Sequence, residues 1–252
     1  MFDQHYACST ARTYVSALGY CHRLAGYSDP TKVFWVLEML KGYTKMGMRV
    51  DTRLPITLPI LLSIVDNMPS LCTTRYESRL YQAMCTTAFF AFLRVGEITI
   101  CPRSPFVLQI EQLVKLEDPT GGILGLKIIF RDFKHSYNKG DVSLTLSRRS
   151  DICPVQILLD YLSLRGFSNG PLFMTTHGTA VSRHSFTQML SLVFQRCGLE
   201  SSKYKGHSFR IGAATFAAEN GFSDVQIRAM GRWKSDAFRR YIRVPSLSSS
   251  SS

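Results

Sequence analysis

HSFRIGAATFAAENGFSDVQIRAMGRWKSDAFRRYIR, residues 207–243, carries the most informative set of reactive side chains in this 252-residue chain. His207 and Arg210 lie three residues apart, Trp233 follows Arg210 by 23 residues, and Tyr241 follows Trp233 by eight. The set combines a permanently charged guanidinium, an imidazole that can exchange a proton and a hydroxyl that can act as a nucleophile. We therefore expect a reactive site that binds an anion, with the fold organised around this stretch.

The same stretch predicts three short helices. A helix rich in small residues over 208–220 ends at Gly221, the Ser223/Gln226 capping box begins the next, and a last one covers 235–243. If a helix begins at Ser208, then His207 and Arg210 lie in its first turn, where the helix dipole also favours an anion. An isolated H-x-x-R is more often an ordinary basic helix start, so the rest of the chain has to support this interpretation.

Upstream, apolar residues at helical spacing predict helices over 9–25, 31–46, 57–68, 76–93, 154–165 and 182–197. The 76–93 helix is the most apolar and is expected to form the core. Two β-rich runs, 123–130 and 142–146, flank the segment RDFKHSYNKGD, whose turn signal predicts a hairpin with a long basic tip. The expected fold class is therefore mainly α with a small β-hairpin or sheet.

Two charged features adjoin these elements. RVGE, residues 94–97, directly follows the most apolar helix, and its simplest explanation is an ion pair between Arg94 and Glu97 that caps a helix. Lys134 lies near the end of the first predicted strand, where the commonest role of a lysine is a solvated loop residue. Together with the C-terminal stretch, Arg94 and Lys134 can instead be interpreted as members of one reactive site.

Combined, these residues suit attack on a phosphodiester. Two guanidinium groups neutralise the phosphate oxygens and stabilise a pentacoordinate transition state. A tyrosine hydroxyl, with an ordinary pKa of about 10, needs an electropositive site and a nearby base, and the leaving 5′ oxygen needs a proton. The candidate catalytic residues are Arg94, Lys134, His207, Arg210, Trp233 and Tyr241.

Composition favours an intracellular protein with a polyanionic partner. Hydrophobic residues make up 45% of the chain and charged residues 19%, which suits a packed core and argues against disorder. The net charge of +12 favours a polyanionic partner such as DNA, RNA or an anionic membrane. The seven cysteines are scattered without CxxC, and there is neither a secretory signal nor an apolar run near 18 residues. We expect no metal and no other cofactor, and a nuclear location if the host is eukaryotic.

Three motifs together resemble a known family. RVGEI (94–98), HSFRIGAAT (207–215) and GRWKSDAFRRYIR (231–243), in this order and with a hairpin lysine between the first two, resemble the tyrosine recombinases, or phage integrases. The resemblance is closest to the branch found in eukaryotic DIRS-type retroelements and Crypton-like transposons. It implies a catalytic domain over 53–245, preceded by a truncated helical, SAM-like core-binding segment over 1–48. The Ser-rich residues 246–252 are expected to form a disordered tail.

The resemblance also implies a reaction and the roles of residues. The family cleaves and rejoins double-stranded DNA through a covalent 3′-phosphotyrosyl intermediate, without metal or ATP, in oligomers that assemble on DNA. The implied roles are phosphate binding for Arg94 and Arg210, general acid for Lys134, the H-x-x-R histidine for His207, the His-or-Trp position for Trp233, nucleophile for Tyr241, and orientation of Arg94 for Glu97.

Several alternatives stay open at the level of sequence. The tryptophan-to-tyrosine interval is one residue shorter than in the best-known bacterial and phage members. Tyr204 or Tyr137 could replace Tyr241 as the nucleophile, and Lys139 could replace Lys134. Two other functions also fit: a decayed or domesticated transposon protein that only binds DNA, and a type IB topoisomerase.

Overall fold

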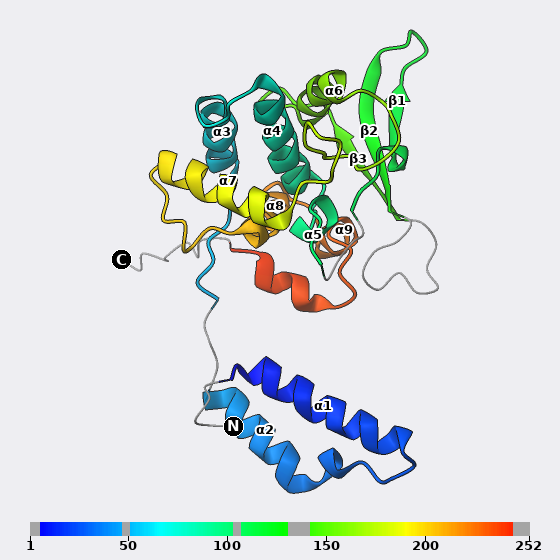
Figure 1. The fold of residues 1–252 in the computed structure, drawn as a ribbon, viewed down its shortest axis with the longest axis vertical. Helices are drawn as coiled ribbons and strands as arrows, with labels where there is room; N and C mark the ends of the chain where they lie inside the picture. The colour runs from blue at the N-terminus through cyan, green and yellow to red at the C-terminus, as the bar shows by residue number, and fades with distance from the viewer. Residues whose placement is uncertain (1–5, 47–50, 103–106, 131–141, 244–252) are drawn as a thin grey trace. The chain divides into compact units, whose positions relative to one another are not determined.

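The computed structural model describes residues 6–46, 51–102, 107–130 and 142–243 (Figure 1). The chain divides into two compact units, Met1–Thr52 and Arg53–Ser252. None of the described helices is both long enough and apolar enough to span a membrane.

The first unit is a pair of helices, α1 (Cys8–Leu24) and α2 (Phe34–Met46), joined by the short 3-10 helix η2 (Pro30–Lys32). The Asp29 carboxylate caps η2 by accepting from the Thr31 amide at 3.0 Å. The Cys8 thiol donates to the Tyr43 carbonyl at 2.8 Å and thereby links the two helices. Only Ala11 and Gly19 of the described helical residues are buried, so this unit has little core of its own.

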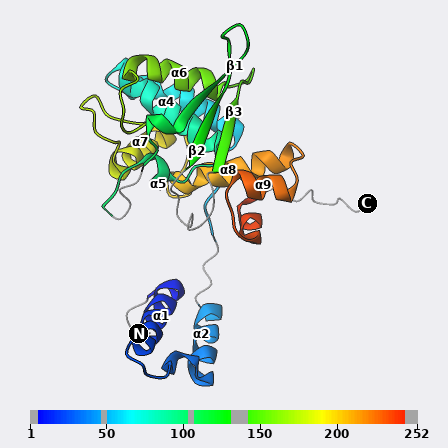
Figure 2. The same cartoon turned by 90° about the vertical axis from the view of Figure 1, so that its right-hand side faces the viewer.

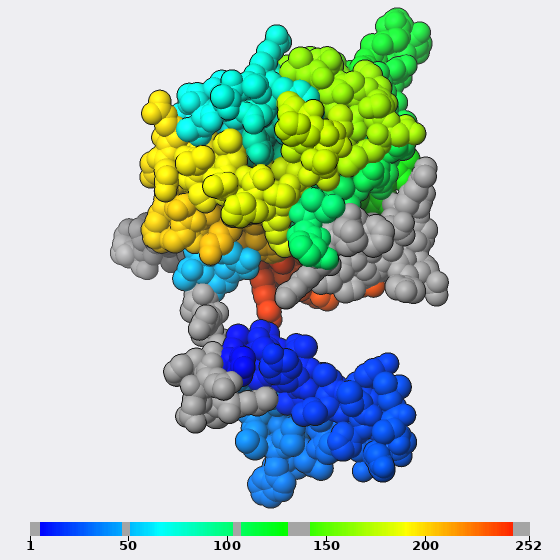
Figure 3. All heavy atoms as spheres, viewed as in Figure 1, coloured from blue at the N-terminus to red at the C-terminus, as the bar shows by residue number. Residues whose placement is uncertain are grey.

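The second unit is mainly helical with one small sheet, which confirms the predicted fold class (Figures 1 and 2). Its helices and strands are α3 (Leu58–Asn67), η3 (Met68–Ser70), α4 (Arg75–Phe90), α5 (Val95–Ile98), η4 (Ile110–Gln112), β1 (Leu113–Glu117), β2 (Ile123–Phe130), β3 (Val142–Ser147), α6 (Pro154–Arg165), α7 (Arg183–Arg196), α8 (Gly206–Glu219), α9 (Asp224–Met230) and η5 (Asp236–Tyr241). In the space-filling view, α6 and α7 form much of the visible face of this unit (Figure 3).

The sheet has three antiparallel strands in the order β1-β2-β3. The predicted pairing of the two β-rich runs is confirmed, with Leu126 opposite Leu146 in the register of β2 and β3. The sequence prediction lacked β1, because this edge strand buries no side chain fully and shows no clean alternation of apolar and polar residues. The predicted hairpin tip, with Lys134, Lys139 and Tyr137, lies outside the described residues.

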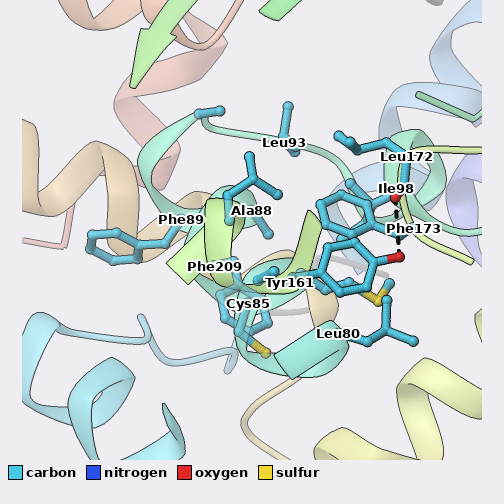
Figure 4. Close-up of a cluster of buried hydrophobic side chains, with 14 of the residues drawn as sticks. Leu80, Cys85, Ala88, Phe89, Leu93, Ile98, Tyr161, Leu172, Phe173 and Phe209 are labelled. Atoms are coloured by element: carbon cyan, nitrogen blue, oxygen red, sulfur yellow. Dashed lines mark hydrogen bonds between the residues drawn. The ribbon is translucent and has the colours of Figure 1, made fainter. Parts of the chain in front are cut away.

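Helix α4 is the core helix, as its apolar sequence predicted. Leu80, Met84 and Ala88 on α4 are at most 2% exposed, and the helix packs against α3, α6 and α8. Beside it, the buried Tyr161 directs its hydroxyl to the Leu172 carbonyl at 3.2 Å (Figure 4). Burial of such aromatic and aliphatic side chains supplies the main stabilisation of the unit.

A smaller apolar cluster lies under the C-terminal segment. Phe92, Ala213, Ala217, Ile227 and Phe238 pack together, so that α9 and η5 are held against α8. The predicted helix over 208–220 begins two residues earlier, at Gly206, and the predicted last helix is the 3-10 helix η5. The alanines of α8 allow this close packing because they present little more than a methyl group.

Candidate active site

The start of α8 brings the H-x-x-R pair next to α5. Gly206 is the first residue of α8, and a Cβ atom there would lie 2.2 Å from Cγ2 of Val95. Only glycine permits this approach, which places His207 near Arg94, the residue that precedes Val95. The structure places His207 in the first turn of α8. Arg210 is the fifth residue of the helix and lies in its second turn, because α8 begins two residues before the predicted start, so the prediction that both share the first turn is wrong for Arg210.

Arg210 is fixed in the interior at 1% exposure. Its Nη1 donates to the Phe92 carbonyl at 2.6 Å, and its Nη2 donates to the Gly231 carbonyl. The guanidinium carbon lies 4.1 Å from the ring centroid of Trp233, a cation–π contact. Phe92 has a positive φ of 51°, and this turn after α4 presents its carbonyl to Arg210. These neutral partners orient the guanidinium without cancelling its charge.

Electrostatics at Arg210 reflect a surplus of positive charge. Burial, together with the charges of Arg94 and Arg232, lowers the pKa of Arg210 to about 9, and Glu97 and Tyr241 oppose this effect. A pKa of about 9 leaves the side chain cationic at neutral pH. The site therefore holds cations that repel one another and that an incoming anion would stabilise.

Arg94 lies at the N-terminus of α5, where the predicted ion pair is present. Its Nη1 is 3.2 Å from Oε1 of Glu97, and Oε2 of Glu97 accepts from the Arg94 amide at 2.7 Å. The same carboxylate pairs with Nη2 of Arg232 at 2.9 Å. One carboxylate is thus shared by two arginines. Arg94 keeps 31% of its side chain exposed, so its guanidinium is accessible.

Tyr241, the last residue of η5, joins this cluster through its ring. Its ring centroid is 4.9 Å from that of His207 and 5.1 Å from that of Trp233. The Thr215 hydroxyl donates to the Tyr241 carbonyl at 3.2 Å and accepts from the Arg243 amide at 3.0 Å. These bonds tie the tyrosine backbone to α8, so residues far apart in the sequence meet at one place.

A basic groove adjoins these residues. It has a volume of about 520 Å³, and its lining includes the cationic side chains of Arg53, Arg94, Arg183 and Lys205 together with His207. Tyr204, the alternative nucleophile, also lines the groove and packs on Phe194 at a ring distance of 5.6 Å. No acidic side chain belongs to the described lining.

Sequence reasoning assigned no role to Arg53, Arg183 or Arg232. Arg53 reaches the groove because the Ile56 amide donates to the Ser208 carbonyl at 3.1 Å, which lays this segment along α8. Arg183 follows the N-cap serine of α7, and that helix start was its only signal in the sequence. Arg232 belongs to the GRW motif, in which only the tryptophan had been given a role.

In the described part of the chain, no group of three or more His, Cys, Asp and Glu side chains is arranged to hold a metal ion. Of the residues predicted to form the site, the structure brings together Arg94, His207, Arg210, Trp233 and Tyr241. The sixth, Lys134, lies outside the described residues.

At the level of sequence, no protein-family model and no curated protein matches this chain. Solved structures do match it. XerH site-specific recombinase bound to difH substrate is 15% identical with a TM-score of 0.58, over 83% of this chain and 60% of the XerH chain. The Tn1549 transposon integrase in complex with circular intermediate DNA is 10% identical with a TM-score of 0.60, over 98% of this chain and 78% of the integrase chain.

A lambda integrase dimer bound to a COC′ core site is 15% identical with a TM-score of 0.55. That match covers 94% of this chain and 59% of the lambda integrase chain, so this chain spans well under two thirds of both XerH and lambda integrase. The arrangement of helices and sheet is thus shared although only 10–15% of the residues are identical. This chain has the fold of the tyrosine recombinase catalytic domain.

Proposed function

We propose that this chain is a tyrosine recombinase that cleaves and rejoins DNA strands through a covalent 3′-phosphotyrosyl intermediate. The observation that supports this most directly is the surplus of positive charge beside a tyrosine. Arg94, Arg210 and Arg232 lie around the single carboxylate of Glu97, and Tyr241 lies close enough to affect the pKa of Arg210.

A phosphodiester matches this surplus. It carries one negative charge, and a second develops on its oxygens as a nucleophile adds to phosphorus. Arg94 and Arg210 supply charge and N–H donors that are already oriented, so they stabilise the transition state without reorganising. Each terminal nitrogen of Arg210 gives one N–H to a carbonyl and keeps a second, because guanidinium carries five donors in all.

The proposed step balances as a transesterification. The Tyr241 hydroxyl oxygen forms a bond to phosphorus while the bond from phosphorus to the 5′ oxygen breaks. His207 takes or holds the phenol proton, and the field of Arg210 stabilises the phenolate. The 5′ oxygen takes a proton from an acid, which the family resemblance assigns to Lys134, with Lys139 as the alternative. Attack of a 5′ hydroxyl on the phosphotyrosine then rejoins a strand, and neither metal nor ATP is required.

The basic groove is proposed to hold the DNA backbone beside the reacting phosphate. Arg53, Arg183 and Lys205 would contact flanking phosphates, and such contacts position a duplex without reading its sequence. In the structures that share this fold, XerH is bound to difH substrate and the Tn1549 integrase is in complex with circular intermediate DNA. We propose duplex DNA as the partner of this chain as well.

The motifs also support a more specific placement. The GRWKSDAFRRYIR stretch favours the branch of DIRS-type and Crypton-like elements, with action in the nucleus of a eukaryotic host and assembly of several subunits on DNA. In this proposal, residues 53–245 form the catalytic domain and residues 1–48 belong to a core-binding domain.

Covalent trapping tests the proposal. The chain is mixed with labelled duplexes that carry a nick, so that a cleaved end diffuses away, and the products are separated on a denaturing gel. The DNA is a randomised pool or the terminal sequences of the source element. We expect a protein–DNA band that disappears in Tyr241→Phe and persists in Tyr204→Phe.

Other outcomes assign other functions. DNA binding on a native gel without any covalent band would favour a protein that only binds DNA. A covalent band that persists in Tyr241→Phe would show that another tyrosine is the nucleophile. Relaxation of a supercoiled plasmid by isolated subunits, without exchange between two sites, would favour a type IB topoisomerase.

A further inference from the structure

Arg232 is the most unusual side chain in the described structure. Its side chain is only 2% exposed, yet its Nε and Nη1 atoms have no hydrogen-bond partner among the described residues. Its backbone has a positive φ of 53°, a conformation that favours glycine. Arg232 thus combines buried N–H groups that lack partners with a strained backbone conformation. Such costs persist only where the packing around a residue holds it in place.

The position of Arg232 follows from its neighbours. It comes directly after Gly231, the C-cap of α9, at the place where helices often have glycine. The chain has its glycine one residue earlier, because a Cβ atom on Gly231 would lie 1.6 Å from the ring of Trp233. Packing of Trp233 therefore requires the glycine, and Arg232 takes the left-handed conformation instead.

The contacts of Arg232 reach the groups that hold both candidate phosphate-binding arginines. Its Nη2 pairs with Oε2 of Glu97 at 2.9 Å, and Oε1 of Glu97 contacts Arg94 at 3.2 Å. The same Nη2 lies 3.5 Å from the Phe92 carbonyl, which accepts from Arg210 at 2.6 Å. The Arg232 guanidinium carbon lies 3.8 Å from the ring centroid of Phe130, the last residue of β2.

These contacts have an electrostatic consequence. Without Arg232, Arg94 and Glu97 would form an ion pair with no net charge. Because Arg232 shares that carboxylate, the three side chains together carry a net charge of +1, which favours an anionic ligand. Burial lowers the pKa of Arg232 itself, while the charge of Glu97 and its hydrogen bond oppose that shift. Arg232 is also one of the cations that lower the pKa of Arg210.

We propose that Arg232 is a positioning residue for strand cleavage: through Glu97 and the Phe92 carbonyl it fixes the placement of Arg94 and Arg210 and offsets the negative charge of Glu97, without touching the phosphate itself. This inference rests on the proposed function.

The test uses Arg232→Met and Arg232→Lys in the full chain, with Arg239→Met as a control from the same segment. Arg239 pairs with Asp224 at 2.8 Å on the surface, so its loss removes an arginine without affecting the site. Single-turnover cleavage of the nicked duplex is measured at saturating protein. We expect Arg232→Met to slow cleavage about 100-fold and to weaken DNA binding only about 5-fold. We expect about a 10-fold slower reaction for Arg232→Lys, which keeps the charge but lacks the planar fork.

Combination with Glu97→Gln separates positioning from general stability. If Arg232 acts through Glu97, adding Arg232→Met to Glu97→Gln slows cleavage by less than about 3-fold, because the carboxylate that connects Arg232 to Arg94 is already absent. Multiplicative effects of the two changes would overturn the inference. Circular dichroism and thermal melting check that each variant folds. If Arg232→Met does not fold, Arg232→Lys replaces it, and its effect on cleavage is again compared with and without Glu97→Gln.

A double-mutant cycle that measures DNA affinity tests the inference even if the chain cleaves no DNA. Arg94→Ala is expected to weaken DNA binding about 5-fold in the parent and less than about 2-fold in the Arg232→Met background, because Arg94 is then already misplaced. Equal losses in both backgrounds overturn the inference. Absence of a phosphotyrosyl product from the parent chain overturns the proposed function instead.

Discussion

Two regions of the second unit bury arginines, and they do so in opposite ways. At the end of α6, Arg165 is 6% exposed, and its guanidinium donates to the carbonyls of Pro171, Gly166 and Ser168 at 2.7–3.1 Å. Around the start of α8, Arg94 and Arg232 share the carboxylate of Glu97, and Arg232 has two nitrogens with no partner among the described residues.

The difference separates an arginine whose nitrogens are all bonded to carbonyls from a group of arginines whose positive charges lie close together. Arg165 closes a loop, and each of its three nitrogens donates to a backbone carbonyl. The arginines near α8 repel one another, and an anion bound between them would reduce that repulsion. Variants in the two regions should therefore affect different properties of the protein.

Arg210→Lys should give the largest effect. Lysine has three N–H donors on one atom against five on the planar guanidinium, so it cannot span both the Phe92 and Gly231 carbonyls and keep more than one N–H for a phosphate. We therefore expect cleavage of nicked DNA to slow by about 1000-fold. Single-turnover kinetics on a denaturing gel measure this. A loss below 10-fold would show that Arg210 is a structural residue like Arg165.

Arg165→Met should act on stability alone. Loss of its hydrogen bonds leaves several carbonyls unpaired, and we expect the free energy of unfolding to fall by about 3 kcal/mol. Urea unfolding followed by circular dichroism measures the change. The cleavage rate per folded molecule should match that of the parent. A slower rate would mean that Arg165 also affects cleavage, so that the two regions do not differ in this property.

Gly206→Ala should change the spacing of the cations. The added methyl group meets Val95 and pushes the start of α8 away from α5, so we expect cleavage to slow about 10-fold and stability to fall by about 1–2 kcal/mol. Gly96→Ala is the matched control, because a Cβ atom at Gly96 meets nothing within 4 Å. The two changes are compared by kinetics and by urea unfolding. Equal behaviour of the two variants would contradict this account.

Thr215→Val should give the smallest effect. It removes the hydroxyl that bonds the Tyr241 carbonyl and the Arg243 amide, while the size of the side chain is kept. We expect a loss of about 1 kcal/mol in stability and a few-fold slower cleavage, because the tyrosine segment is less firmly held to α8. Thermal melting and single-turnover kinetics measure these changes. Unchanged values for both would mean that the apolar packing around Phe238 suffices to hold η5.

Much of the local structure was predictable from the sequence, because local signals determine it. Helical spacing of apolar residues located α4 as the core helix, and the Ser223/Gln226 capping box located the start of α9. The order of the three motifs indicated the recombinase fold, which the solved structures confirm. Lys134, Lys139 and Tyr137 lie outside the described residues, so their assignments stay predictions.

Motif order and helical periodicity were enough to identify the reactive side chains and the helices that carry them. How the charges of these side chains are balanced depends on the folded arrangement. The turn at Phe92, the sharing of Glu97 and the burial of Arg232 all depend on residues that are more than a hundred positions apart. Periodicity and motif spacing report local geometry, whereas the energy of a buried charge depends on every group packed around it, whatever its position in the chain.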